Sequence, residues 1–260
     1  MKKPMLRNTL AFAIALGTTA GASAAEFYVS GSLGLADTDD LSNDGTFTQD
    51  FTTGEVTGVT PPLVIPAGQA VGWTTELDSG TAFGIAGGVR LDNFRIELEY
   101  AGASNDVDTH GGVVAGGIAL DAIDAGVLLT GNVGDLGTSV GALVADGRGE
   151  VETSAFYVNG FYDFDTGSAW TPYVGVGIGT ANVEVEYAPS GVGIIDDDDD
   201  VLTYQVMGGV AYGFTENLEA TGGIRYRVME EASLNSPLLN ASFDIEVESF
   251  IYEVGVRYTF

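Results

Sequence analysis

The chain contains one histidine, His110, and no cysteine, so few residues could activate a nucleophile. A hydrolase or acyltransferase needs a nucleophile with a base held beside it. His110 lies in an acidic, glycine-containing stretch close to Asp106, Asp108 and Thr109, and no Ser–His pair can be argued from the spacing. A solvated loop histidine is the simpler interpretation. The sequence therefore predicts a protein that is not an enzyme and has no catalytic residues; lipid turnover lost on His110→Ala would contradict this.

A run of acidic residues is the second group whose chemistry matters, because carboxylate oxygens attract divalent cations. The run comprises Asp196, Asp197, Asp198, Asp199 and Asp200. It lacks the spaced ligands and the turn glycine of a calcium-binding loop. Adjacent like charges also repel one another and favour a solvated, flexible segment. We therefore expect a disordered loop with diffuse attraction of divalent cations, no defined metal site and no cofactor.

Arginines and carboxylates also recur at every second position of apolar segments, as in Arg95, Glu97 and Glu99. Alternate side chains of a β-strand point to the same side. Applied to all such segments, this pattern places five basic and five acidic residues on one side. They are Arg90, Arg95, Glu97, Glu99, Asp163, Glu219, Arg225, Arg227, Glu253 and Arg257. The opposite side of each segment is apolar.

The C-terminal segment shows the alternation most clearly. Its apolar row is Phe250, Tyr252, Val254, Val256, Tyr258 and Phe260. A strand with lipid on one side and a polar interior on the other has this pattern. Eight such segments can be identified, at about residues 27–35, 81–91, 94–100, 151–164, 170–187, 202–214, 218–228 and 250–260. Because lipid tolerates no free sheet edge, they predict a closed, all-β, eight-stranded antiparallel up-and-down transmembrane β-barrel.

The connections between these segments alternate in length. Short turns are expected near residues 91–93, 165–169 and 215–217, and long loops at about 36–80, 104–150, 188–200 and 230–244. This alternation predicts long extracellular loops and both termini on the periplasmic side. The loop at 105–149 includes the apolar stretch GGVVAGGIALDAIDAGVLL. It could extend the neighbouring strands as a hairpin, fold over the barrel mouth, or add a strand pair.

The interior of an eight-stranded barrel is about wide enough for side chains to fill. The planar fork of arginine suits carboxylates, and an unpaired ion in a narrow lumen is costly. We therefore predict that the ten interior charges pair and close the lumen. The alternative is a narrow pore for small solutes or ions.

The N-terminal residues predict an export signal. Lys2, Lys3 and Arg7 precede an apolar stretch at residues 10–16, and Ala22-Ser23-Ala24 offers a small-residue cleavage pattern. The expected division is a cleaved signal peptide at 1–25 and a barrel domain at 26–260. After cleavage six basic and 37 acidic residues remain, a net charge of −31, mostly from the long loops. Such a surface repels phosphate backbones, so nucleic acid is excluded as a partner.

Several stretches resemble one family of outer-membrane proteins. They are LDNFRIELEY, FYVNGFYDF, TPYVGVGIG, VLTYQVMGGVAYG, the ending VGVRYTF and the first strand FYVSGSLGL. The chain looks like the opacity-protein and surface-antigen group, whose barrels are OmpA-like and eight-stranded. The resemblance implies an antigenic or adhesive protein of the Gram-negative cell outer membrane whose function lies in variable loops. It also implies that Tyr258 and Phe260 form the signal read by the barrel-assembly machinery.

These observations favour a structural or surface-interaction role over a pore or an enzyme. The expected partners are outer-membrane lipid and lipopolysaccharide, the barrel-assembly machinery, and host or environmental surface ligands. We expect a monomer. Since Phe260 ends the last strand, no peptidoglycan-binding domain is expected.

Overall fold

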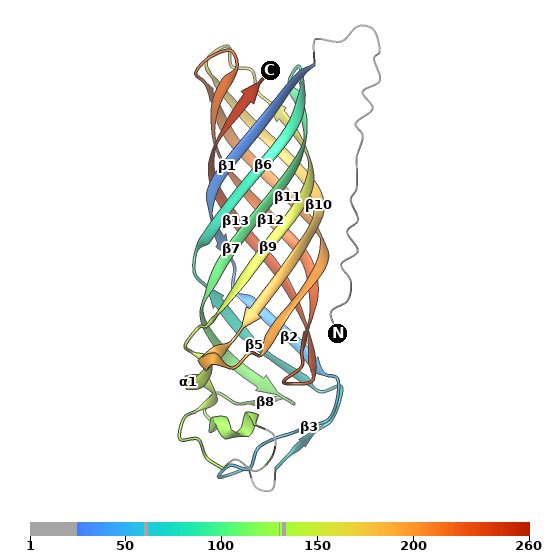
Figure 1. Cartoon of the computed structure of the whole chain (residues 1–260), viewed down its shortest axis with the longest axis vertical. Coiled ribbons are helices and arrows are strands. Elements are labelled where there is room, and N and C mark those ends of the chain that lie inside the picture. The colour runs from blue at the N-terminus through green and yellow to red at the C-terminus, as the bar shows by residue number, and fades with distance from the viewer. Residues whose placement is uncertain (1–24, 60–61, 130, 132–133) are drawn as a thin grey trace.

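A closed ring of antiparallel strands forms the wall of the molecule. The computed structural model describes residues 25–59, 62–129, 131 and 134–260, and within them eight long strands pair around a closed circuit. In ring order these are β1 (Glu26–Thr38), β6 (Gly80–Leu91), β7 (Phe94–Ala115), β9 (Gly149–Asp163), β10 (Trp170–Tyr187), β11 (Ile195–Gly213), β12 (Leu218–Ser236) and β13 (Ala241–Thr259), which pairs with β1. The all-β prediction is confirmed (Figure 1). The expected signal at 1–25 lies outside the described residues, apart from Ala25.

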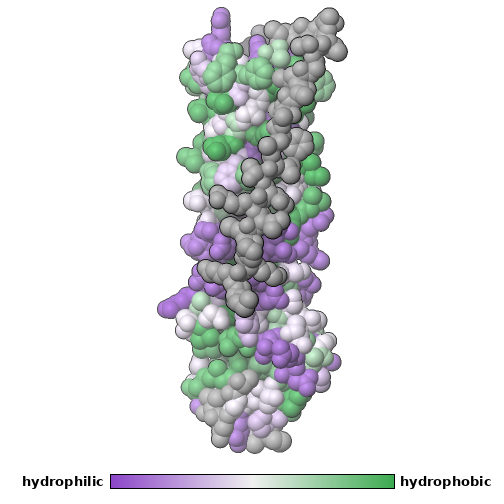
Figure 2. Space-filling model, turned by 45° about the vertical axis from the view of Figure 1, so that its right-hand side comes forward, coloured by the Kyte–Doolittle hydropathy of each residue, from purple (hydrophilic) through white to green (hydrophobic). Residues whose placement is uncertain are grey.

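The half of the barrel that carries the C-terminus has an apolar outer surface, and we call it the belt region. Val254 and Val256 of β13 are 69% and 58% exposed on this surface, whereas Arg257 is only 3% exposed and faces inward. The predicted short turns lie at this end of the barrel, the first of them using a positive φ of 54° at Asp92. Figure 2 shows hydrophobic residues over this half and a hydrophilic band below it. The outer face therefore has the character expected of a surface in contact with lipid.

Aromatic rings mark both edges of the belt region. At the edge near the molecule's middle, the ring centroids of Tyr100 and Phe156 are 4.9 Å apart. At the edge near the short turns, those of Phe94 and Tyr162 are 5.1 Å apart. Aromatic side chains with a polar tip favour the boundary between hydrocarbon and water. The two edges therefore have the composition of interfacial girdles.

The wall continues beyond the belt region as a second section, which we call the extension. Here β2 (Leu41–Phe47) and β5 (Ala70–Leu77) replace β1 and β6, because β2 pairs with β13 and β5 pairs with β7. The β1–β6 register, with Ala36 opposite Gly80, continues without a shift in β2–β5, where Leu41 lies opposite Thr75. A strand of 22 residues such as β7 is about 70 Å long. Crossing a bilayer needs only about 9–11 residues. The surplus length builds the extension.

All four segments expected as long loops therefore contribute strand to the wall, and the expectation of loops was wrong for those parts; for 105–149, extension of the neighbouring strands was one of the alternatives left open. The segment 104–150 supplies the end of β7 and the start of β9, and 188–200 supplies the start of β11. The physical reason is an apolar core inside the extension, where Val183, Ile245 and Phe243 are fully buried. Burial of such side chains in a closed sheet stabilises strands that would otherwise be acidic loops.

Short elements cap the far end of the extension (Figure 1). They are β3 (Phe51–Thr52), β4 (Val64–Ile65), β8 (Ile118–Ala119), the 3₁₀ turns η1 (Ala125–Leu128) and η2 (Pro189–Gly191), and α1 (Val140–Val144). Asp124 holds this cap, since its carboxylate accepts the backbone N–H groups of Gly126, Leu136 and Gly137. No helix in the described part of the chain is long and apolar enough to cross a membrane.

Candidate functional site

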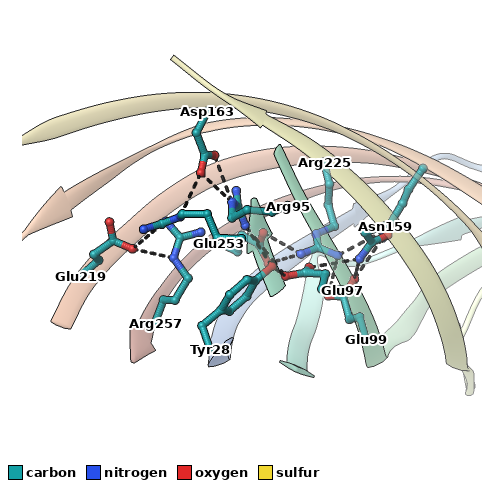
Figure 3. Close-up of polar contacts among 12 residues, drawn as sticks. Tyr28, Arg95, Glu97, Glu99, Asn159, Asp163, Glu219, Arg225, Glu253 and Arg257 are labelled. Carbon is teal, nitrogen blue, oxygen red and sulfur yellow. Dashed lines mark hydrogen bonds and ion pairs between the residues drawn. The ribbon is translucent and has the colours of Figure 1, made fainter. Parts of the chain in front are cut away.

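The ten charged residues predicted to share one side all lie inside the belt region. Seven of them are buried, namely Arg95, Glu97, Glu99, Asp163, Arg225, Arg227 and Arg257, whereas Arg90, Glu219 and Glu253 are half-buried. They project from β6, β7, β9, β12 and β13 and meet across the barrel axis (Figure 3). The alternation of the strands places them there, because neighbouring positions carry the apolar outer face.

One cluster of ion pairs lies toward the short-turn end of the barrel. Arg95 Nε contacts both carboxylate oxygens of Asp163, at 2.8 and 3.0 Å. Glu219 Oε2 accepts from Arg257 Nε at 2.6 Å and from Arg90 Nη2 at 3.1 Å. Arg90 Nε also lies 3.6 Å from Asp163, which joins the two pairs into one group. Charge-assisted bonds of this length are stronger than neutral hydrogen bonds.

A second cluster is centred on Arg225. Its Nη1 donates to Glu99 Oε1 at 2.8 Å, and its Nη2 contacts both oxygens of Glu253 at 2.7 and 2.9 Å. The amides of Asn159 and Gln205 donate to Glu99 Oε2 at 2.7 and 3.0 Å. The second oxygen of Glu99 thus has its own donors, which a buried carboxylate requires.

Tyr28 and Glu97 join the two clusters. The Tyr28 hydroxyl donates to Glu97 Oε2 at 2.8 Å and lies 3.4 Å from Arg95 Nη1. Asn159 Nδ2 also contacts Glu97 Oε1 at 3.2 Å. The guanidinium of Arg95 lies 4.3 Å from the centre of the Phe161 ring, so an aromatic face supports it where carboxylates do not. The result is one continuous polar network from β1 to β13, which we call the lumen network.

Three members of this network were not among the candidates predicted from sequence: Tyr28, Asn159 and Gln205. All three occupy inward positions of their strands and are at most 2% exposed. The available signal was their position in the alternation, since a polar side chain on the inward face must find a partner. They were not predicted because only ionisable residues were considered as candidates for the interior.

Arg227 departs from the expected pairing. It is 2% exposed, yet no carboxylate in the described residues lies within ion-pair distance of it. Its Nη2 lies 3.4 Å from Gln205 Oε1, and its guanidinium lies 5.1 Å from the centre of the Tyr157 ring. The expectation that all ten interior charges would pair was therefore wrong at Arg227. An aromatic face and an amide oxygen replace the carboxylate there.

Little space remains around the lumen network. A cavity of about 50 Å³ lies among its members, lined by Arg95, Glu97, Glu99, Arg225 and Glu253. One water molecule needs about 10–15 Å³ of such space. The cavity therefore has room for a few waters between the charged groups.

The other two candidate sites lie in the extension and differ from expectation. His110 is not a solvated loop residue: it belongs to β7, is 3% exposed, and its Nδ1 lies 2.9 Å from the Thr75 hydroxyl. Its ring contacts Tyr187, with centroids 4.8 Å apart. The apolar interior of the extension explains the burial. Within the described residues, no serine bonds to it.

The aspartate run is also ordered, as part of β11 and not as a flexible loop. Asp197 accepts from the backbone N–H of Asn235 at 2.9 Å, and Asp199 accepts from that of Ser233 at 3.0 Å. These carboxylates occupy backbone donors of β12 that would otherwise lack partners. The alternate members Asp196, Asp198 and Asp200 face outward. In the described part of the chain, no group of three or more His, Cys, Asp or Glu has a metal-holding arrangement.

Tyr258 and Phe260 lie on the outer surface at the end of the last strand, 47% and 73% exposed. Their ring centroids are 5.4 Å apart. The backbone N–H of Phe260 donates to Phe27 at 2.9 Å, so the terminal residue is tied to the first strand.

Known proteins match this chain in sequence and in structure. The outer membrane protein PagN of Salmonella typhimurium is 29% identical over 84 residues, which is 30% of this chain and 35% of the length of PagN. The crystal structure of OprG from Pseudomonas aeruginosa superposes with a TM-score of 0.55 and 18% identity, covering 92% of this chain and 98% of OprG. Neisserial surface protein A gives a TM-score of 0.46 at 16% identity, covering 92% of this chain and all of that structure.

A family model described as the outer membrane protein beta-barrel domain matches residues 9–260. The match includes every strand of the ring and the extension. Both the outward apolar belt and the inward polar network agree with this assignment, and so does the outer-membrane location of the relatives. The chain belongs to the family of outer-membrane β-barrel domains.

Proposed function

We propose that this protein is an eight-stranded, up-and-down barrel with a sealed lumen that holds a rigid acidic surface outside the cell for contact with other surfaces. The lumen network is the observation that carries the proposal. It joins opposite sides of the barrel where Arg225 of β12 contacts Glu99 of β7, and it ties the neighbouring strands β7 and β9 together through Arg95–Asp163. A pore would need a continuous watery path, and the network leaves a cavity of about 50 Å³ at this level.

The energetics favour closure. Separating Arg225 from Glu99 and Glu253 would leave buried charges without partners, which costs several kcal/mol. An ion passing through would have to open these bonds, because the guanidinium and both carboxylates meet across the axis (Figure 3). The charges therefore support a plug more strongly than an ion path.

Conductance in planar bilayers tests the sealed lumen. We expect no steady unitary current from the natural protein. The double variant Glu99→Ala with Arg225→Ala removes one charge of each sign, so it should open a leak while leaving the net charge unchanged. Glu246→Ala, on the outer face of β13, is the matched control and should stay silent. Large, steady currents from the natural protein would establish the pore instead.

The outer face of the extension supports the surface-contact role. Like charges lie directly opposite one another across neighbouring strands, in one row through Asp106, Glu150, Glu186 and Asp196 and in the next through Glu152, Glu184 and Asp198. Opposed like charges in a sheet are destabilising. The extension's described ion pairs include a single basic residue, Arg148, which lies 3.4 Å from Asp146. An arrangement that lowers stability without structural benefit is typical of a functional surface.

The negative charge on the outer face of the extension determines which kind of partner it favours. A cationic surface or a basic protein would relieve the repulsion, whereas a polyanion would increase it. Outer-membrane lipid and lipopolysaccharide surround the belt region, and the barrel-assembly machinery reads Tyr258 and Phe260 before insertion. The proposed state is a monomer, and the closed ring needs no strand from a second chain.

Adhesion of the protein in nanodiscs to polylysine-coated and heparin-coated surfaces tests the contact role. We expect salt-sensitive binding to polylysine and none to heparin. The variant Glu152→Gln with Glu184→Gln and Asp198→Asn should weaken binding. Thr166→Ala with Ser168→Ala, at the short-turn end, is the control and should not. Binding to heparin, or binding to polylysine unchanged in the triple variant, would contradict the proposal.

A further inference from the structure

An apolar chamber, partly open to the exterior, lies at the far end of the extension, under the cap. Its volume is about 310 Å³, and its walls include Phe47, Trp73, Val113, Ala115, Leu120 and Val144. It lies within a core whose other side chains pack closely, such as Val183 and Ile245, both with no exposed surface. Protein interiors hold few voids larger than a water molecule, so a chamber of this size is unusual.

The size of the chamber sets the size of a ligand. An engineered apolar cavity of about 150 Å³ stays dry and binds benzene. The chamber here is about twice that volume, so it fits a molecule of about 10–12 non-hydrogen atoms. Apolar pockets of about 300 Å³ with a few polar groups are typical of small-molecule sites.

The hydrogen bonds of the Thr75 hydroxyl determine which ring nitrogen of His110 carries the proton. The Thr75 hydroxyl accepts from Asn43 Nδ2 at 2.8 Å and from Trp73 Nε1 at 3.2 Å. Both groups are donors only, so the two lone pairs of the hydroxyl are occupied and its hydrogen is free to donate. It therefore donates to His110 Nδ1 at 2.9 Å, and the imidazole proton lies on Nε2.

His110 Nε2 is consequently an N–H donor in the wall of the chamber. Within the described residues it makes no hydrogen bond of acceptable geometry. The backbone carbonyl of Arg148, which accepts the N–H of Ala188 at 2.9 Å, lies near the ring and raises the pKa of His110 slightly. A buried donor without a partner costs about as much free energy as a lost hydrogen bond, so an acceptor on a ligand would be favoured there.

Electrostatics select a neutral ligand over an anionic one. Burial lowers the pKa of His110 to about 4, against smaller opposing effects of Asp146 and the Arg148 carbonyl, so the ring is uncharged at neutral pH. Among the described residues, no lysine or arginine lines the chamber. The outer face of the extension is acidic, which repels a carboxylate before it reaches the cap.

We propose that this chamber binds a neutral, mainly apolar molecule of medium length that carries one hydrogen-bond acceptor, such as a medium-chain alcohol, and that His110 Nε2 donates to that acceptor. The apolar walls supply affinity through burial of the chain, and His110 Nε2 orients it, beside the buried Tyr187 hydroxyl that also lines the chamber. An anionic molecule of the same length is excluded, because the chamber offers it no cation.

The two tryptophans of the chain allow a direct test. Trp73 lines the chamber, whereas Trp170 is 54% exposed on the outer face of the belt region. In detergent micelles, 8-bromo-1-octanol should quench Trp73 saturably in Trp170→Phe. In Trp73→Phe, quenching of Trp170 should rise in proportion to the 8-bromo-1-octanol that partitions into the micelle, and it should not saturate. The matched anion 8-bromooctanoate should quench Trp73 at least tenfold more weakly at neutral pH.

Substitutions in the chamber wall test whether the quenching of Trp73 arises from binding inside the chamber. Ala115→Phe or Val113→Phe, each combined with Trp170→Phe, fills the space and should abolish saturable quenching of Trp73; heat-modifiable gel mobility checks that each has folded. His110→Phe keeps a ring but loses the donor, and should weaken 8-bromo-1-octanol about fivefold while leaving 1-bromooctane unchanged. Any one of three results overturns the proposal. They are quenching of Trp73 that does not saturate, quenching that survives both filled variants, and quenching that is equal for the alcohol and the carboxylate.

Discussion

The belt region and the extension share six strands, β7 and β9 to β13, but have opposite chemistry. Along β13, Phe243, Ile245 and Val247 face inward in the extension, and Glu253 and Arg257 face inward in the belt region. The alternation continues through both without a break. Outward residues change in the reverse sense, from acidic to apolar, between Glu248 and Phe250. The strand geometry sets which side a residue faces, and the surrounding solvent sets which chemistry is stable there.

The same reversal occurs on β9, on the other side of the barrel. The outward residues change from Glu152 to Phe156, and the inward residues change from Val151 to Asn159 and Asp163. The aromatic contacts Tyr100–Phe156 and Tyr226–Phe250 lie at this level on separate strand pairs. The boundary between water and hydrocarbon therefore circles the barrel at one height.

The largest expected effect comes from putting a belt-type charge inside the extension. Ile245→Arg would bury a cation among apolar side chains with no carboxylate to pair with, at a cost of about 5 kcal/mol or more. We expect the extension to open while the belt region stays folded, because the two have separate cores. Trypsin sensitivity of residues in the extension, followed by mass spectrometry, would show this.

The neighbouring substitution Glu246→Arg is the control. Its side chain faces water among other acids, so the change should be neutral or slightly stabilising. If Ile245→Arg resists trypsin as well as Glu246→Arg does, the extension has no separate apolar core of the kind described.

A second prediction removes the central cation of the belt region. Arg225→Met would leave the buried Glu99 and the half-buried Glu253 without their partner, which destabilises by about 3–5 kcal/mol. Urea unfolding in lipid vesicles, monitored by gel mobility, measures the effect. Adding Glu99→Gln and Glu253→Gln to Arg225→Met should recover much of the loss, because no buried charge is then orphaned. No recovery in the triple variant would mean that shape, and not charge pairing, stabilises the network.

The belt region and the extension also differ in how far their structure could be predicted from the sequence. The structure places on the inward face of the belt region all ten charges that the sequence assigned to one side, because a lipid-facing strand alternates sharply between apolar and polar residues. In the extension, some segments of the strands lack the sequence pattern that indicates a strand. Asp196–Asp200 has low strand propensity, and His110 lies among acids and glycines, so both segments look like loops. Their strand structure depends on pairing with distant segments and on the shared core, which local patterns do not record.

Asn159, Gln205 and Tyr28 were missed for a different reason. Each is neutral, and its importance arises only because a buried carboxylate lies opposite it on another strand. Which inward residues of different strands meet depends on the stagger of the barrel. The alternation within one strand therefore identified the face but not the contacts across the lumen.

A third, smaller effect concerns pH and the core of the extension. Burial lowers the pKa of His110 to about 4, below the value near 6.5 expected in an unfolded chain. The unfolded state therefore takes up a proton first, and stability falls as pH decreases from about 6.5 to about 4. Between about pH 7.5 and 5 the loss should reach about 2 kcal/mol.

Trp73 emission in Trp170→Phe reports on this loss within the extension, since Trp73 lies in its core. His110→Phe removes the titrating group, so its stability should depend less on pH over the same range. The difference between the two proteins isolates His110 from the carboxylates. Equal pH dependence of both would show that His110 is not buried in its neutral form.

The smallest effect lies on the outer face of the extension, where Glu152 lies directly opposite Glu184. Repulsion from Glu150, together with burial and Glu184, raises the pKa of Glu152 above its ordinary value. A raised carboxyl pKa means that ionisation opposes folding, so the penalty is present at neutral pH and disappears as pH falls below the pKa of the unfolded chain. Glu152→Gln should therefore stabilise the extension by a few tenths of a kcal/mol at neutral pH and low salt.

Salt and pH distinguish this repulsion from a change in packing. The gain from Glu152→Gln should shrink as ionic strength rises toward about 0.15 M, where charges are screened over about 8 Å. It should also shrink as pH falls below the ordinary pKa of a glutamate, because the natural side chain becomes protonated in both states. Glu253→Gln, on the inward face of the belt region, should behave oppositely and destabilise at every salt concentration, because it breaks the bidentate contact with Arg225. The same change of side chain thus has opposite signs in the two regions, because water surrounds one carboxylate and a buried cation holds the other.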